Sequence, residues 1–271
     1  MTREEAESIL RDAGEAEEKA FPLMEAAIAC AIHDLPFRDV APARALAEVA
    51  GARLAERLNT ESPEEALAET LSGDLRLTGD LLTYDDPANT DVVDVADRRR
   101  GLSITLGIFY LHAARKAGLK ADGVDFPGHF LLRVDTPEGP VALDPFSQGR
   151  LVLPSELTRR ALRAGLTPDV ADRLEMLMAP VSDRQVVVRL QNMLYARALD
   201  HGDFESAERS AIRRALLEPQ DHRPWLDVAA AREKQGALSG ALEALAKAQH
   251  LDQGAASVAR AARERVRLRL N

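Results

Sequence analysis

The chain has 271 residues, 46% of them hydrophobic and 29% charged, and its formal net charge is −9 at pH 7. This composition is typical of a folded, soluble, helix-rich protein rather than a disordered one, and the length allows either one hydrophobic core or two. The acidic balance argues against general nucleic-acid binding, because neutralising phosphates requires a basic face.

The sequence predicts neither a secretion signal nor a membrane span. Residues 1–20 are acidic, and no later stretch approaches the roughly 18 to 20 apolar residues that cross a bilayer. The single cysteine, Cys30, excludes an internal disulfide and every zinc site that needs several cysteines. It lies in the apolar run 26–32, so we expect a buried side chain. A cytoplasmic protein without metal or cofactor is the expectation.

Helices are predicted throughout residues 1–72. Ala, Leu, Glu and Arg dominate this region, and its apolar positions recur at helical spacing. Ser62 followed by Pro63 and two glutamates is a typical helix start, with serine as the capping residue. We expect the region to pack on the core that follows it.

The pattern of the next region, residues 73–180, predicts an α+β core in a chain that is mostly α. Loop residues dominate at first, a helix is expected from about Asp91, and the most apolar helix of the chain spans 103–117 and ends at Gly118. Short strands are then predicted at 120–125, 129–135, 140–143 and 151–154. The expected core is a small antiparallel sheet against one central helix.

The C-terminal region, residues 186–271, repeats itself. Gly202 and Gly236 lie 34 residues apart, which is the tetratricopeptide period. At the same offset Phe204 matches Leu238, Ala207 matches Ala241, and Leu217 matches Leu251. We expect two helical hairpins closed by a capping helix over 255–270, and since about three repeats are usually needed for stability, we expect the repeats to lean on the core.

Three short segments of the core region combine residue types that catalysis needs. A helix starts near residue 103, His129 opens one predicted strand and Asp144 ends the next. A nucleophile at a helix start, a histidine base and an orienting carboxylate form the general arrangement for nucleophilic catalysis.

At these positions the chain resembles the SirB-type family of bacterial transglutaminase-like proteins with C-terminal tetratricopeptide repeats. The matching segments are Tyr84–Pro87 with Asn89, Arg98–Gly101 leading into Ser103–Leu106, Phe126–Phe130, and Asp144–Phe146. The resemblance implies a transglutaminase-like, papain-like core in which His129 and Asp144 occupy the superfamily's histidine and aspartate positions. The cysteine position falls on Ser103, so the resemblance also implies the loss of the thiol nucleophile.

Two interpretations of these residues stay open. Ser103 is either a nucleophile activated by His129 or a cap of the central helix. His129 and Asp144 are either functional or a structural pair retained because removing one partner would leave the other unsatisfied.

Arg98, Arg99 and Arg100 form a second candidate site. Three arginines ahead of a helix start could gather an anion such as a phosphate or a nucleotide. The alternative is ion pairing with Asp91, Asp94, Asp97 or the acidic pair at 85–86.

Three functions therefore compete. The leading hypothesis is a non-catalytic binding or regulatory protein whose repeats hold a protein or peptide partner. The second is an acyl-transfer hydrolase, of peptidase or amidase type, that uses Ser103, His129 and Asp144. The third is an anion or nucleotide sensor that uses the three arginines.

Overall fold

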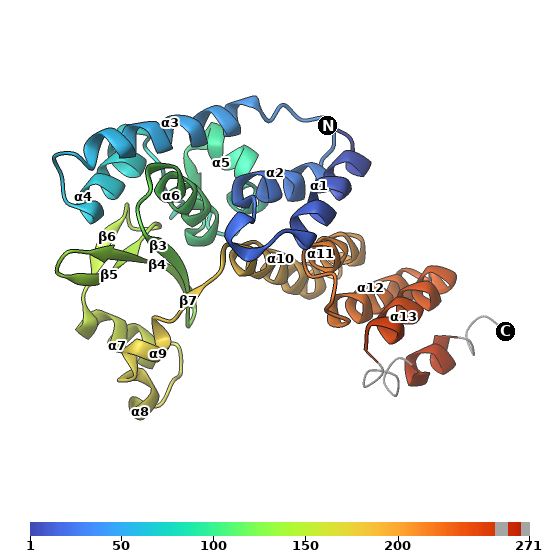
Figure 1. Ribbon diagram of the computed structural model, residues 1–271. Coiled ribbons are helices and arrows are strands. Elements are labelled where there is room, and N and C mark those ends of the chain that lie inside the picture. The colour runs from blue at the N-terminus through green and yellow to red at the C-terminus, as the bar shows by residue number, and fades with distance from the viewer. Residues whose placement is uncertain (253–259, 267–271) are drawn as a thin grey trace. The chain divides into compact units, whose positions relative to one another are not determined.

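A computed structural model describes residues 1–252 and 260–266, and its chain divides into two compact units (Figure 1). Residues 39–186 form one, here called the sheet unit; residues 1–38 together with 187–271 form the other, the helical unit. This division cuts the expected N-terminal region 1–72 between Arg38 and Asp39. The second boundary falls inside one helix, α10 (Asp183–Asp200).

The sheet unit is built from helices around a five-stranded sheet, and it also contains a two-stranded parallel sheet formed by β1 and β2. Its helices are α3 (Ala41–Arg57), α4 (Pro63–Ala68), the π-helical turn η2 (Glu69–Asp74), the 3-10 turn η3 (Pro87–Thr90), α5 (Val92–Arg98), α6 (Ser103–Ala117), α7 (Pro154–Arg163), α8 (Pro168–Ala171) and α9 (Leu174–Leu177). Its strands are β1 (Thr78–Gly79), β2 (Arg100–Gly101), β3 (Ala121–Phe126), β4 (His129–Thr136), β5 (Gly139–Asp144), β6 (Arg150–Val152) and β7 (Pro180–Val181). The expected fold class, mostly α with a small antiparallel sheet, is confirmed.

Five of the strands form an antiparallel sheet in the order β6-β5-β4-β3-β7 (Figure 1). Strands β3 to β6 are joined by consecutive hairpins. Phe126 of β3 pairs with His129 of β4, and Leu132 of β4 pairs with Leu143 of β5. Because β4 and β5 run in opposite directions, the first residue of β4, His129, and the last of β5, Asp144, come to the same end of the sheet. The two-residue strand β7 at one edge was not predicted.

Helix α6 is the buried centre of the sheet unit, as predicted. It begins at Ser103 and is ended by Gly118, whose φ of 71° is the left-handed conformation that glycine adopts at a helix end. Gly107 allows the helix to approach β4, since a Cβ at this position would clash with the ring of Phe130. The aromatic ring takes the space that a side chain on the helix would need.

The opposite face of the sheet is covered by α7 to α9. One hydrophobic cluster joins β3 and β4, through Phe126 and Leu131, to Leu157 and Ala161 of α7 and Leu177 of α9. Side chains alternate between the two faces of a strand. Leu131 therefore lies on the face of β4 that α7 covers, and Phe130 lies on the face that α6 covers.

The helical unit combines the N-terminal helices with the C-terminal ones. Its elements are α1 (Arg3–Glu15), the 3-10 turn η1 (Glu18–Ala20), α2 (Leu23–Asp34), α11 (Phe204–Leu217), α12 (Arg223–Gln235) and α13 (Leu238–Leu251), and it takes in α10 from Val187 onward. Helix α11 packs on α12 and α12 on α13, and α1 packs on both α2 and α11. Gly202 and Gly236 both adopt positive φ, 71° and 79°, at the turns between helices. Residues 260–266 are helical, and the rest of the expected capping helix lies outside the described residues.

Polar contacts tie α2 to α11. Arg213 donates from Nη1 to the Cys30 carbonyl of α2 and from Nε to Gln191 at 2.6 Å. Asp34, the last residue of α2, pairs with Arg209 at 2.6 Å. Helices α1 and α2 are thus packing partners of α11 within the helical unit.

A membrane-spanning helix requires length and apolar character together. None of the helices within residues 1–252 and 260–266 has both.

Candidate functional site

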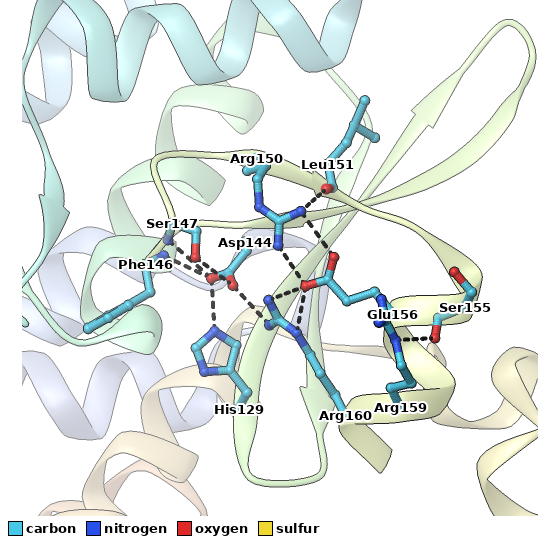
Figure 2. Close-up of polar contacts among 10 residues, drawn as sticks. All are labelled: His129, Asp144, Phe146, Ser147, Arg150, Leu151, Ser155, Glu156, Arg159 and Arg160. Atoms are coloured by element: carbon cyan, nitrogen blue, oxygen red, sulfur yellow. Dashed lines mark hydrogen bonds and ion pairs between the residues drawn. The ribbon is translucent and has the colours of Figure 1, made fainter. Parts of the chain in front are cut away.

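The sheet brings His129 and Asp144 together, as the sequence predicted. His129 Nε2 lies 2.8 Å from Asp144 Oδ1, and Figure 2 shows the imidazole and the carboxylate facing each other at the sheet end. Asp144 is almost fully buried, at 1% exposure. The histidine edge also lies against Phe146, with ring centroids 6.2 Å apart.

Asp144 accepts several further hydrogen bonds. Its Oδ1 accepts the backbone N–H of Phe146 at 3.1 Å, and its Oδ2 accepts the Ser147 hydroxyl at 3.1 Å and Arg160 Nη1 at 2.9 Å. Burial by itself would raise the pKa of Asp144, but His129 and Arg160 outweigh burial and lower the pKa to about 2. The carboxylate is therefore ionised at neutral pH, and its role toward His129 is to orient the ring and not to take its proton.

Arg160 is the participant that the sequence did not reveal. It belongs to α7, where Glu156 one turn earlier accepts from it at 2.8 Å, and Glu156 also pairs with Arg150 of β6 at 2.6 Å (Figure 2). Hydrogen bonds from Arg150 and Arg160 lower the pKa of Glu156 to about 2. Glu156 and Arg160 have the four-residue spacing of a helical ion pair, but nothing in the sequence places α7 beside the end of β5.

The position of His129 in β4 determines the face of the sheet on which its side chain lies. Its cross-strand partner Phe126, and Leu131 two residues further along β4, both belong to the cluster covered by α7. Strand alternation therefore directs His129 to the α7 face, where Arg160 binds Asp144. Phe130, on the other face, packs at Gly107 of α6.

Ser103 is the first residue of α6 and 8% exposed. The interpretation of Ser103 as a helix cap is wrong: the N-cap residue is Leu102, whose side chain makes no cap hydrogen bond. Among the residues that the structure describes, no hydrogen bond joins the Ser103 hydroxyl to the ring of His129. The only sulfhydryl of the chain, Cys30, is buried at 5% exposure within α2 of the helical unit, as expected.

The three arginines are dispersed by the fold. Arg98, the last residue of α5, pairs with Asp80 and Asp86, both at 3.1 Å. Arg99 takes the left-handed conformation that ends α5, with φ of 60°, and Arg100 lies exposed in β2. The ion pair with Asp86 is one of those weighed as the alternative to an anion site.

An anchored loop with exposed leucines lies beside this end of the sheet. Asp80 accepts the backbone N–H of Leu82 and Thr83 and the Thr83 hydroxyl, and these bonds lower the pKa of Asp80 to about 2. The loop leaves Leu81 and Leu82 82% and 83% exposed. Tyr84 then packs edge-on against Phe146, the aromatic neighbour of His129.

Within residues 1–252 and 260–266, no three or more His, Cys, Asp or Glu side chains are grouped so as to hold a metal ion.

A buried helix against a small antiparallel sheet, with a histidine and an aspartate meeting at adjacent strand ends, defines the class to which the core belongs. The chain is a member of the transglutaminase-like superfamily, whose sequence profile matches residues 41–192. This match begins with α3 and ends within α10.

Similar proteins include several bacterial UPF0162 proteins. One from Xylella fastidiosa strain Temecula1 is 34% identical over 174 residues, 63% of this chain and 61% of the relative. UPF0162 protein PA3419 from Pseudomonas aeruginosa is 28% identical over 238 residues, 73% of this chain and 85% of the relative. F-box only protein 21 of Mus musculus is 35% identical over 69 residues, 26% of this chain and 11% of the relative. The chain thus spans about three fifths of the length of the Xylella fastidiosa relatives that it matches. No solved structure matches it.

Proposed function

We propose that this chain is a non-catalytic, SirB-type member of its superfamily that binds a protein or peptide partner through tetratricopeptide-type hairpins. The observation that carries the proposal is that Ser103, which stands at the cysteine position, makes no hydrogen bond to His129 within the described residues. A serine hydroxyl has a far higher pKa than a thiol, so a helix N-terminus alone cannot activate it.

The surroundings of His129 and Asp144 support a structural role for this pair. Hydrogen bonds to His129, Ser147 and Arg160 connect the ends of β4 and β5 with α7. Removing one member of such a buried polar group leaves the others unsatisfied, which is a sufficient reason to retain it without catalysis.

The helical unit supports a binding role. Stacked helical hairpins bury their apolar faces against each other and leave extended surfaces for partners. The 34-residue offset between Gly202 and Gly236, with positive φ at both turns, supports the tetratricopeptide assignment.

Labelling with a fluorophosphonate probe tests the absence of catalysis. This reagent modifies serines that a neighbouring base activates, so we expect Ser103 to stay unlabelled in the full chain, as judged by peptide mass spectrometry. His129→Gln serves as the matched variant. Stoichiometric labelling of Ser103 that disappears in this variant would overturn the proposal.

Site-specific photo-crosslinking tests the binding role. A benzophenone amino acid replaces exposed Ala246 on α13 in one protein and exposed Arg163 on α7 in another. In an extract of the organism that encodes the chain, we expect one protein to be crosslinked from position 246 and not from position 163. Crosslinks from position 163 alone, or from neither position, would contradict the proposal.

An acyl-transfer hydrolase is the second candidate. The 2.8 Å contact between His129 and Asp144 favours it, because a base and its orienting carboxylate are in place. This function requires the Ser103 hydroxyl to come within about 3.2 Å of the His129 ring. The labelling experiment separates the two candidates.

Anion sensing through Arg98, Arg99 and Arg100 has less support. Arg98 already has two carboxylate partners, Asp80 and Asp86. A thermal-shift series with nucleotides and phosphorylated metabolites tests this third candidate, and absence of stabilisation would remove it.

A further inference from the structure

A groove of about 710 Å³ runs between α1, α11 and α13 of the helical unit. Its apolar lining includes Ile212 and Leu216 of α11 and Trp225 of α12, and all three side chains are partly exposed. Charged side chains of α1 and α13 line it as well. The groove therefore combines apolar surface with charged walls.

The N-terminal helix fixes one wall of this groove. Helix α1 packs so closely on α11 that a Cβ at Gly14 would clash with the Leu216 carbonyl. Arg11 on the same helix is paired with Glu7 at 3.0 Å. This wall is thus supplied by residues outside the repeats, and its arginine is already neutralised by a neighbour.

The α13 wall carries positive charge next to the apolar surface. Lys247 Nζ lies 4.1 Å from the centroid of the Trp225 ring, so among the described residues its ammonium faces an aromatic ring rather than a carboxylate. His250, one turn further along α13, is exposed and also lines the groove. In a chain of net charge −9, this wall offers a local site for carboxylates.

The α1 wall contributes a negative charge instead. Glu15 lies exposed near the end of α1 and lines the groove. Acidic residues of a ligand are therefore expected along α13 and away from the end of α1. A segment with apolar residues on one stripe and carboxylates along one flank matches this arrangement.

We propose that the groove between α1, α11 and α13 binds an acidic amphipathic helix of a partner protein, a proposal that rests on the binding function proposed above. Apolar residues at helical spacing contact Trp225 and Leu216, and the acidic flank faces Lys247 and His250. A helix satisfies its own backbone hydrogen bonds, which suits a groove whose walls are helices with no open strand edge.

The single tryptophan of the chain makes the test direct, because Trp225 lines the groove and all tryptophan emission comes from it. The probe is a synthetic amphipathic helix with leucines at i, i+3, i+4 and i+7 and glutamates along one flank, free of Trp and Tyr. A second peptide carries lysines in place of the glutamates. Emission of the full chain is recorded on titration, and anisotropy of fluorescein-labelled peptides is the independent readout.

We expect saturable binding of the acidic peptide and weaker binding of the basic one. Lys247→Glu should weaken the acidic peptide about tenfold, which corresponds to about 1.4 kcal/mol. Lys247→Arg should retain binding, and Lys234→Glu, a charge reversal at an exposed position of α12 outside the groove lining, should leave it unchanged.

Three results would overturn the inference: no saturable binding of the acidic peptide in either readout, equal binding of the two peptides, or equal loss in the Lys247→Glu and Lys234→Glu variants. The proposed function is judged separately. If a partner crosslinked from position 246 is retained in the Lys247→Glu background, binding by the helical unit stands and the acidic-helix assignment fails.

Discussion

Asp144 shows how one buried carboxylate organises an end of the sheet. It receives donors from β4, from its own turn and from α7, so three elements depend on its charge. Arg160 supplies the full positive charge of this group, because a guanidinium stays protonated at every pH at which the protein folds. We therefore expect Arg160 to matter for the stability of the sheet unit.

Replacing Arg160 by Met tests this expectation. The variant keeps the apolar stem of the side chain and leaves the buried Asp144 with less charge compensation. We expect the free energy of unfolding to fall by about 2 kcal/mol, measured by urea denaturation of the full chain. Arg159→Met on the same helix, where Arg159 bonds only the carbonyl of Ser155 among the described contacts, is the control and should change it by under about 0.5 kcal/mol. Equal effects would contradict the assigned role.

Acid should remove the stabilisation contributed by the Asp144 carboxylate within a defined range of pH. The pKa of Asp144 is about 2 in the folded protein, against an ordinary value of 3.8. Because the folded value is lower, its stabilisation is fully present above about pH 4 and is lost as the pH falls from about 4 to 2. In Arg160→Met this loss should begin at higher pH.

His33 predicts a second pH dependence, in the helical unit. Its ring is buried at 1% exposure, and burial together with the charge of Arg213 and Arg3 lowers its pKa from 6.5 to about 3. The unfolded chain binds a proton below pH 6.5 while the folded chain does so only near pH 3, so stability falls as the pH drops through this range.

The variant His33→Gln removes this titration. We expect the loss of unfolding free energy between pH 7 and pH 5 to be smaller by about 2 kcal/mol than in the parent chain. Urea denaturation at the two pH values measures it, with His201→Gln at an exposed position as the control. An unchanged pH difference in His33→Gln would show that His33 titrates normally.

At the scale of elements, α6 was the easiest to predict. An apolar run with a glycine after its last residue specifies a buried helix locally, and the structure keeps these bounds. The helix starts were harder. Ser62 does occupy the N-cap position of α4, but its side chain makes no cap hydrogen bond, and the N-cap position of α6 is occupied by Leu102, which makes none either. Cap bonds depend on the rotamer and the neighbours of a residue, which its type does not fix.

Gly107 connects α6 with the sheet and gives a prediction at this scale. In an isolated helix, alanine would be favoured over glycine by about 1 kcal/mol. In α6 the added methyl would clash with Phe130, so we expect Gly107→Ala to destabilise the protein by about 1 to 3 kcal/mol. Thermal denaturation of the full chain measures the change.

Gly240→Ala is the matched control for this substitution. Gly240 lies in α13, and the atoms nearest to an added Cβ belong to the flexible end of Arg232, at 3.2 Å or more. Because this contact is much less tight than the contact with Phe130 at Gly107, the helical preference for alanine should prevail, and we expect no loss of stability. A stabilising effect of Gly107→Ala would mean that the contact between α6 and β4 is looser than described.

At the scale of the whole molecule, the two units are not consecutive stretches of the chain. Residues 1–38 form one unit with residues 187–271, and residues 39–186 are inserted between them. Buried contacts such as Arg213 with the Cys30 carbonyl connect segments 183 residues apart. Two hairpins are a short array, and α1 and α2 extend the surface against which they pack.

This organisation predicts how fragments behave. Residues 187–271 alone should lack cooperative melting, because the surfaces that α1 and α2 cover become exposed. Residues 1–38 joined to 187–271 by a flexible linker of about 20 residues should restore a cooperative transition. Circular dichroism with temperature measures both. An equally cooperative transition for residues 187–271 alone would show that the N-terminal helices are dispensable.

The sequence by itself determined the elements whose signals are local. The apolar period of α6, the strand alternation around His129 and Asp144, and the 34-residue spacing of two glycines are all contained in short stretches of chain. Even the meeting of His129 and Asp144 follows from two consecutive hairpin strands, since antiparallel pairing brings the start of one to the end of the next.

Only the tertiary structure decided what these residues face. Arg160 at Asp144, Arg98 between Asp80 and Asp86, and α1 beside α11 are contacts between segments that no local pattern links. Long-range neighbours are chosen by the packing of whole elements, in which many side chains must fit at once, and a sequence pattern records the period of an element but not its partner.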